Sequence, residues 1–392
     1  MTRTPYIIVA IAYVSFVGLG ISAAIIGVLW SPHILSDFNQ SLEALSIYLI
    51  VTTAGYFLGS SVSGQVFSRY PVSWVLASAM ALTAASMASF SLSPAWWVMV
   101  SLSALMGLGT GLLDGGMNIY FAAHFNARLM NWLHACFGIG ALAAPQLVNF
   151  IVIEQGVSWR WAYGIVALGF ALMALAYALT RHLWLPIQET GHHSGTPYRE
   201  TLRLGAVWIA IIIFMAYAGA EAGAGNWLAP FFQSQEIPDA VGNNWVTAYW
   251  LSFTVGRILF GTIATRFAPA MVVRLCLLLA LAGLGLLVWR PMPEANLIGV
   301  VVFGFALSPC FALLITATQD QLGPVHAPNA IGLEVAAASL GAGILPALMG
   351  ATIPLTGISF LPFMLIGLIV AMLLLYQWSL SPIFSLRKLR QA

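Results

Sequence analysis

The chain has 392 residues, of which 60% are hydrophobic and only 7% are charged, and its formal net charge is +2. Its mean hydropathy is +0.92. Soluble domains carry about 25% charged residues, so this composition excludes a soluble protein and predicts an integral membrane protein. The small positive charge gives no indication of a nucleic-acid partner. We expect the lipid bilayer to be the main solvent.

Breaks in the hydropathy divide the chain into twelve apolar segments. A bilayer core of ~30 Å needs about 20 apolar residues per helix, and each segment is long enough to cross it. The predicted limits are 6–30, 44–66, 72–92, 95–122, 130–153, 160–181, 204–230, 244–264, 270–289, 295–318, 327–350 and 358–380. The first segment has no small-residue cleavage site, so we expect it to be retained as a span.

Lysine and arginine concentrate on one side of these spans. Short cytoplasmic loops are enriched in both residues, which places the two termini and the loop 181–203 in the cytoplasm. That side holds Arg3, Arg69, Arg128, Arg181, Arg199, Arg203, Arg266, Arg274, Arg387, Lys388 and Arg390. Only Arg160 and Arg290 fall on the other side. We predict a multi-pass protein of the cell's inner (plasma) membrane.

The two halves of the chain share motifs. GYFLGSSVSGQVFSRYP in span two and SFTVGRILFGTIATRFAP in span eight align at an offset of 197 residues, pairing Gly59 with Gly256, Gly64 with Gly261 and Arg69 with Arg266. Gly107 and Gly304 share this offset, and GALAAP at 140–145 matches GAGILP at 341–346. We therefore predict two duplicated six-helix bundles, 1–185 and 204–392, joined by a linker at 186–203. Parallel repeats of this kind are typical of alternating-access transporters.

The glycine–arginine–aromatic pattern that ends spans two and eight is similar to the short cytoplasmic loop of the major facilitator superfamily. The usual acidic residue of that loop is replaced by Ser68 in the first half and by Thr265 in the second. The resemblance covers the whole chain. It implies an all-α membrane fold of twelve transmembrane helices, in which two six-helix bundles are related by a pseudo-twofold axis.

Asp114 lies inside the apolar run GTGLLDGGMNIYF of span four. A charge within a span costs at least ~2.5 kcal/mol on insertion scales and marks a functional site by default. Gly107, Gly111 and Gly115 form a ridge of small residues, which lets helices approach closely. Asp114 and Asn118 lie beside this ridge, one turn apart. We predict that this polar pair faces a cavity near the middle of the membrane.

Other ionisable side chains lie inside predicted spans. His134 either relays protons or satisfies a backbone carbonyl near the start of span five. Glu334, near the corresponding place in the second half, needs a partner or a proton when buried. Arg257 could extend towards the membrane surface or pair with Asp320, and we interpret it as a structural or gating ion pair, with substrate binding as the alternative.

Span seven contains GAEAGAGNW, residues 219–227, in which three glycines weaken the helix. A broken helix at the interface between repeats indicates a transport site, so we predict a break here beside Glu221. Asn226 and Trp227 would supply an amide for hydroxyl groups and a flat apolar face for a sugar ring. Trp227 is equally well explained as an aromatic anchor at the membrane surface.

Asp114-Gly-Gly-Met-Asn118 resembles the Glu-x-x-x-Asn of span four in the fucose–galactose–glucose–proton symporter family. Residues 131–141 (NWLHACFGIGA), 158–163 (SWRWAY) and 221–227 (EAGAGNW) are similar to bacterial members of that family and to its sodium-dependent glucose transporter-like branch. The resemblance implies that Asp114 is the proton-linked carboxylate and Asn118 a ligand-facing amide. The fucose permease also has an acid in span one, whereas residues 6–30 contain none. Glu221 is our candidate for the missing second acid.

We therefore expect a secondary transporter for a sugar or similar small polar solute, working as a monomer and coupled to H⁺, with Na⁺ as the alternative. The candidate proton-coupling residues are Asp114, Glu221, Glu334 and His134. The candidate substrate-binding residues are Asn118, Asn226 and Trp227. The candidate gating or structural residues are Arg69, Arg128, Arg257, Arg266 and Asp320.

Two alternatives stay open at this point. The same fold would also suit outward transport of an amphiphile or drug, and a membrane sensor without transport is the third hypothesis. The sequence has no hydrolase, metalloprotease or P-loop motif, so we expect no enzymatic activity. Cys136, Cys276 and Cys310 have neither CxxC spacing nor histidine partners, so we expect no metal site and no cofactor.

Overall fold

The computed structural model describes residues 4–125, 127–186, 197–263, 268–292 and 294–381. The first half contains α1 (Thr4–Leu29), α2 (Leu35–Asp37), α3 (Leu45–Arg69), α4 (Val72–Ser91), α5 (Trp96–His124), α6 (Ala127–Val148) and α7 (Trp159–Leu179). The second half contains α8 (Tyr198–Thr201), α9 (Gly205–Gln233), α10 (Asp239–Ile263), α11 (Pro269–Trp289), α12 (Ala295–Leu307), α13 (Cys310–Thr356) and α14 (Leu361–Ser379).

Eleven helical segments of the described residues are long and apolar enough to cross a membrane. The helix α10, with 25 residues, adds a twelfth segment of comparable length. The predicted twelve-helix fold is therefore confirmed, although two boundaries differ. The first segment continues past residue 30 to Asp37, through a break at Ser31 where the backbone is extended. The helix α13 contains the end of span ten and the whole of span eleven, which are separated by a turn at Gly323 with φ of 66°.

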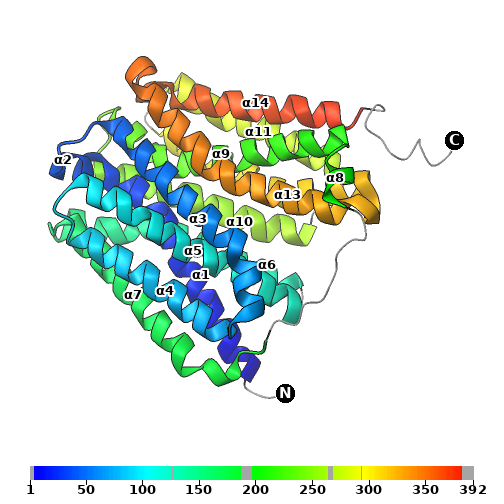
Figure 1. The fold of residues 1–392 in the computed structure, drawn as a ribbon. Helices are drawn as coiled ribbons and strands as arrows, with labels where there is room; N and C mark the ends of the chain where they lie inside the picture. The colour runs from blue at the N-terminus through cyan, green and yellow to red at the C-terminus, as the bar shows by residue number, and fades with distance from the viewer. Residues whose placement is uncertain (1–3, 126, 187–196, 264–267, 293, 382–392) are drawn as a thin grey trace.

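The helices form two bundles, α1 to α7 and α9 to α14, which pack side by side (Figure 1). Helix α1 begins at Thr4 and α14 ends at Ser379 at the same end of the molecule, which we call the terminal end. The helix α2 lies at the other end, which we call the opposite end. The chain thus crosses the membrane an even number of times.

The outward faces of the bundles are apolar, as lipid contact requires. On α7, Leu168, Leu172, Leu175 and Leu179 are all more than half exposed. They recur every three or four residues and therefore share one face of the helix. In water such a face would promote aggregation, whereas in a bilayer it contacts lipid chains.

The repeat that the sequence predicts reappears as matching close contacts. A Cβ added to Gly107 of α5 would lie 2.1 Å from the Thr52 carbonyl oxygen of α3. In the second half, a Cβ on Gly304 would lie 2.6 Å from the carbonyl oxygen of Tyr249. Both partners, like both glycines, are 197 residues apart. The same relation holds for Gly59 against Leu108 and for Gly256 against Phe305. The duplicated unit thus includes these glycine-to-carbonyl contacts between helices.

Replacing Gly107 with alanine is expected to destabilise the first bundle. The new methyl group would overlap the Thr52 carbonyl, and overpacking of this kind costs about 1–3 kcal/mol. A lower midpoint in a thermal unfolding assay in detergent would show the effect. Gly169→Ala in α7 is the matched control, since its added Cβ would have nothing within 4 Å. Equal midpoints for the two variants would contradict the prediction.

The break predicted in span seven is wrong, because α9 is one continuous helix from Gly205 to Gln233. Its glycines serve close packing instead. A Cβ on Gly219 would meet the side chain of Leu345, and one on Gly225 would lie 2.8 Å from the ring of Trp250. Glycine costs helix propensity, but at these positions neighbouring helices fill the space and the helical hydrogen bonds persist.

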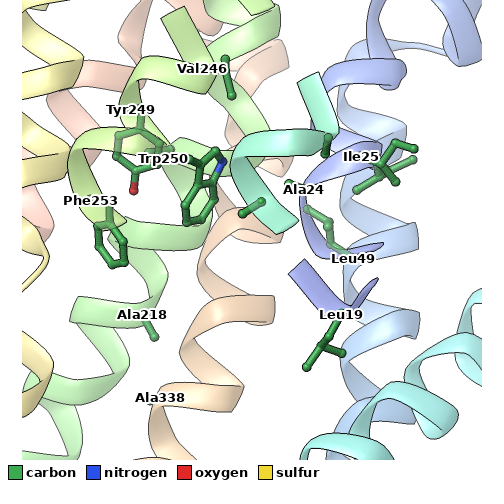
Figure 2. Close-up of a cluster of buried hydrophobic side chains, with 14 of the residues drawn as sticks. Leu19, Ala24, Ile25, Leu49, Ala218, Val246, Tyr249, Trp250, Phe253 and Ala338 are labelled. Carbon is green, nitrogen blue, oxygen red and sulfur yellow. The ribbon is translucent and has the colours of Figure 1, made fainter. Parts of the chain in front are cut away.

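A buried hydrophobic cluster spans both bundles. Figure 2 shows Tyr249, Trp250 and Phe253 of α10 together with Leu19 and Ile25 of α1, which belongs to the other half. A continuous apolar contact of this kind holds the two bundles together in the present state.

At the opposite end, neutral polar side chains join the two bundles. The Gln146 amide of α6 donates to Asn244 Oδ1 at 2.9 Å and to Thr247 Oγ1 at 2.8 Å. Asn149 donates to Asn244 Oδ1 at 3.2 Å and to the Ala240 carbonyl at 3.3 Å, and it accepts from Asn243 Nδ2 at 2.8 Å. We call Gln146, Asn149, Asn243 and Asn244 the amide latch. Gln233 adds a bond across the same end, to the Ser31 carbonyl.

Candidate functional site

A chain of hydrogen bonds connects three helices of the first bundle. Asp114 of α5 accepts a hydrogen bond from the Tyr56 hydroxyl of α3. Asn118 Nδ2, one turn further along α5, donates to Asp114 Oδ1 at 3.0 Å. His134 Nε2 of α6 lies 3.0 Å from Asn118 Oδ1. The structure therefore brings together three residues that the sequence singled out and adds Tyr56.

The glycine ridge positions this chain. Gly111 packs against the Tyr56 backbone, where an added Cβ would lie 2.2 Å from the carbonyl oxygen. This contact holds α3 close enough for the tyrosine ring to reach Asp114, which is one turn further along α5. The predicted role of the ridge in close packing is confirmed. Asp114 and Asn118 are half-buried, so part of each side chain remains accessible.

A second polar cluster lies in the other bundle. Arg257 of α10 lies 3.6 Å from the Glu221 carboxylate of α9 and donates to the Tyr217 hydroxyl at 3.3 Å. Its guanidinium also sits 4.4 Å from the centre of the Phe253 ring. The hydroxyl of Tyr249 donates to the Glu221 carbonyl at 3.2 Å. The side chains of Glu221 and Arg257 retain 15% and 27% exposure.

This pairing corrects the prediction for Arg257. Asp320, the expected partner, is exposed on α13 shortly before the turn at Gly323. Glu221, by contrast, lies on the helix directly beside Arg257. A guanidinium inside a membrane span needs a nearby anion to offset its desolvation. Because Glu221 meets that need, the ion pair forms within the second bundle and does not reach the loops.

The two clusters face each other across the bundle interface. His134 interacts electrostatically with Asp114 in its own bundle and with Arg257 in the other. Asp114 and Glu221 thus belong to separate clusters, and His134 and Arg257 connect them. The arrangement places both acids, one base and one cation near the middle of the helices.

Glu334 is separate from these clusters and fully buried. Its Oε1 accepts a hydrogen bond from Thr318 at 2.7 Å, and its Oε2 has no partner among the described residues. Thr318 lies before the turn at Gly323 and Glu334 after it, so this bond ties two neighbouring spans together.

Asn226 and Trp227 follow Glu221 on α9 and lie nearer to the opposite end of the molecule, outside both clusters. Trp227 is fully buried, and its indole N–H donates to the Pro346 carbonyl at 2.8 Å. This excludes the alternative of a membrane-surface anchor, since the ring packs inside the second bundle. Asn226 is 7% exposed and donates to the Ala222 carbonyl at 2.8 Å. A Cβ added to Gly27 of α1 would lie 2.8 Å from Asn226 Cα, so the bundles touch here.

Arg69 and Arg128 lie at the terminal end. Arg69 is exposed at the last position of α3. The Arg128 guanidinium lies 5.1 Å from the centre of the Trp132 ring. Arg266 lies outside the described residues.

Sequence reasoning missed Tyr56, Tyr217 and Tyr249, which complete the two clusters. Each is a tyrosine within an apolar helix, and such residues usually find a hydrogen-bond partner when buried. For Tyr56 a signal was available, because it lies between Gly55 and Gly59 on the helix that packs against the Asp114 ridge. For the other two, only the fold shows which helix they face.

The fold and the clusters define a class of protein: a multi-pass membrane transporter built from two duplicated bundles. Residues 12–242, more than half of the chain, match the family described as the Major Facilitator Superfamily. The chain therefore belongs to the Major Facilitator Superfamily, as its resemblance implied.

Several characterised relatives are similar along most of the chain. The glucose/mannose transporter GlcP of Bacillus subtilis is 23% identical over 82% of this chain and 82% of its own length. The human sodium-dependent glucose transporter 1 is 23% identical over 86% of this chain and 71% of its own length. Among solved structures, a D-xylose–proton symporter is 13% identical with a TM-score of 0.73, covering 96% of this chain and 97% of that one. The nucleoside transporter NupG reaches a TM-score of 0.77 at 14% identity, covering 95% and 99%. These structural matches support the fold alone.

Proposed function

We propose that this protein is a secondary transporter for a sugar or similar small polar solute, coupled to protons. The observation that carries the proposal is the pair of half-buried polar clusters, around Asp114 and around Arg257, which face each other from two bundles. Carboxylate, amide and guanidinium groups of this kind fix the orientation of a polyhydroxyl ligand. The names of relatives that transport glucose or mannose support the same substrate class.

The proposed mechanism is alternating access. Residues 1–185 would rock against residues 204–392 around the two clusters, with 186–203 as the linker. Most of that linker lies outside the described residues. Enclosing an ionised carboxylate in a dry site costs free energy, so Asp114 would take up a proton before its cluster is closed off. Substrate and proton would then cross together.

The distribution of lysine and arginine supports an orientation with the terminal end in the cytoplasm. The amide latch then closes the outer side of a plasma-membrane protein, and the present state faces inward. Asn226 and Trp227 are enclosed in this state. We propose that they contact substrate only when the opposite end opens.

Purified protein in liposomes is expected to accumulate a labelled sugar when a pH gradient is imposed. The panel should include D-glucose, D-mannose, D-xylose and L-fucose. A parallel series with a Na⁺ gradient and no pH gradient separates the two coupling ions, and a series with no gradient detects facilitated exchange. If no sugar enters under any of these conditions, sugar transport is excluded and an amphiphilic substrate becomes the next one to test.

A further inference from the structure

The Tyr56 hydroxyl lies between two polar groups that belong to different bundles. Its proton is directed at Asp114 Oδ2 in the first bundle. The Ser339 side chain of α13, in the second bundle, lies close to the same hydroxyl. Ser339 Oγ donates to the Val335 carbonyl at 3.1 Å, so its oxygen keeps lone pairs that can accept a hydrogen bond.

The hydrogen bonds at Asp114 all run towards the carboxylate. Tyr56 donates to Oδ2, while Asn118 donates to Oδ1. This arrangement suits the ionised form, because an ionised carboxylate only accepts hydrogen bonds. Protonated Asp114 has an O–H that needs an acceptor. The amide nitrogen of Asn118 cannot accept, whereas the oxygen of Tyr56 can accept once its own O–H has rotated away.

We propose that Tyr56 is a positioning residue that links the protonation of Asp114 to the contact between the bundles. Its hydroxyl donates to Asp114 when the carboxylate is ionised. When Asp114 is protonated, the Tyr56 hydroxyl accepts from Asp114 and donates to Ser339 Oγ. Tyr56 keeps its own proton throughout, and the one added proton stays on Asp114. Protonation thus adds a hydrogen bond between α3 and α13.

The surroundings of Asp114 limit what else can respond to pH. From α6, His134 faces it through Asn118, and Arg257 of α10 interacts with His134. The helix α4, which also packs on α5, presents the uncharged hydroxyl of Thr83 at Gly109. A change in pH therefore acts here through Asp114 or His134, and the test must separate the two.

The inference rests on the proposed role of Asp114 as the proton site, and infrared difference spectroscopy tests both without a substrate. The wild-type protein in lipid is titrated with acid while the carboxylic C=O stretch is recorded. The Asp114→Asn variant identifies the band that belongs to Asp114, and His134 contributes no carboxylic band. If no band disappears in Asp114→Asn, Asp114 does not titrate, and both the proton coupling by Asp114 and the present inference are overturned.

Two variants are expected to move the titration midpoint in opposite directions. Ser339→Ala removes an acceptor that serves only the protonated state, so the midpoint should fall, by roughly half to one pH unit for one hydrogen bond. Tyr56→Phe removes the stronger bond to the charged carboxylate, so the midpoint should rise. Thr53→Val is the matched control, because Thr53 also contacts α13, at Gly343, without touching Asp114.

Suppose that the band lost in Asp114→Asn does titrate in the wild type. An unchanged or raised titration midpoint of that band in Ser339→Ala would then overturn the inference. In that case the proposed transport function stands and only the link through Tyr56 fails. A midpoint shift in Thr53→Val as large as that in Ser339→Ala would also overturn it, because any loosening of α13 would then suffice.

Discussion

Replacing Asp114 with asparagine is expected to abolish gradient-driven accumulation while substrate exchange without a gradient continues. Asparagine keeps the shape of the side chain and its hydrogen bond with Asn118 can be preserved, but it cannot take up a proton. Accumulation ratios in liposomes should fall from the wild-type value to about one, because an uncoupled carrier only equilibrates its substrate. Labelled uptake with and without an imposed pH gradient measures the effect.

The Asp320→Asn variant is the control for this experiment. It removes a carboxylate from an exposed position on α13, outside both polar clusters. Its accumulation should match that of the wild type. If Asp114→Asn retains full accumulation with an unchanged pH dependence, Asp114 has no part in coupling, and Glu221 and Glu334 are the remaining carboxylates to test.

Opening of the opposite end is expected to increase when Asn149 is replaced by alanine. This residue makes hydrogen bonds with Ala240, Asn243 and Asn244 across the bundle interface. Its loss also leaves the amide of Asn243, which is only 3% exposed, without that acceptor. An unsatisfied buried group costs about 1–3 kcal/mol, equivalent to roughly a 5- to 150-fold change in the ratio of open to closed forms.

Spin labels introduced by Glu154→Cys and Ser234→Cys report this opening, because the two exposed positions lie at the opposite end in different halves. A longer-distance population should grow in Asn149→Ala. Asn296→Ala is the matched control, since it breaks an amide–amide bond of 2.9 Å, to Gln235, at the same end but within one bundle. Identical distance distributions in Asn149→Ala and the background protein would show that the latch does not hold this end closed.

The twelve spans, the repeat and the Asp114–Asn118 pair could all be predicted from the sequence. Each depends on spacing along one helix or on similarity between two segments, and those are properties of the chain itself. The ridge of Gly107, Gly111 and Gly115 followed the same logic, because two successive GxxxG steps indicate a packing face. They do not show which helix this face meets.

The errors arose where the outcome depends on a neighbouring helix. The glycines around Glu221 were interpreted as a break, but the side chains of Leu345 and Trp250 fill the space beside them. Arg257 was assigned to an acid at the end of another span, although lateral packing of α9 against α10 places Glu221 beside it. Likewise, no pattern in the sequence shows that Tyr217 reaches Arg257 or that Tyr249 reaches Glu221, because each contact joins residues on different helices.

The amide latch carries no charge, and this bears on how the protein responds to its surroundings. Dissolved ions weaken attractions between exposed charges, but they have little effect on bonds between neutral amides. The ion pair at the same end, Arg160 with Asp37 at 2.8 Å, lies within one bundle and does not resist separation of the two. The balance between closed and open forms at this end should therefore stay nearly constant as the salt concentration in the solution around it varies.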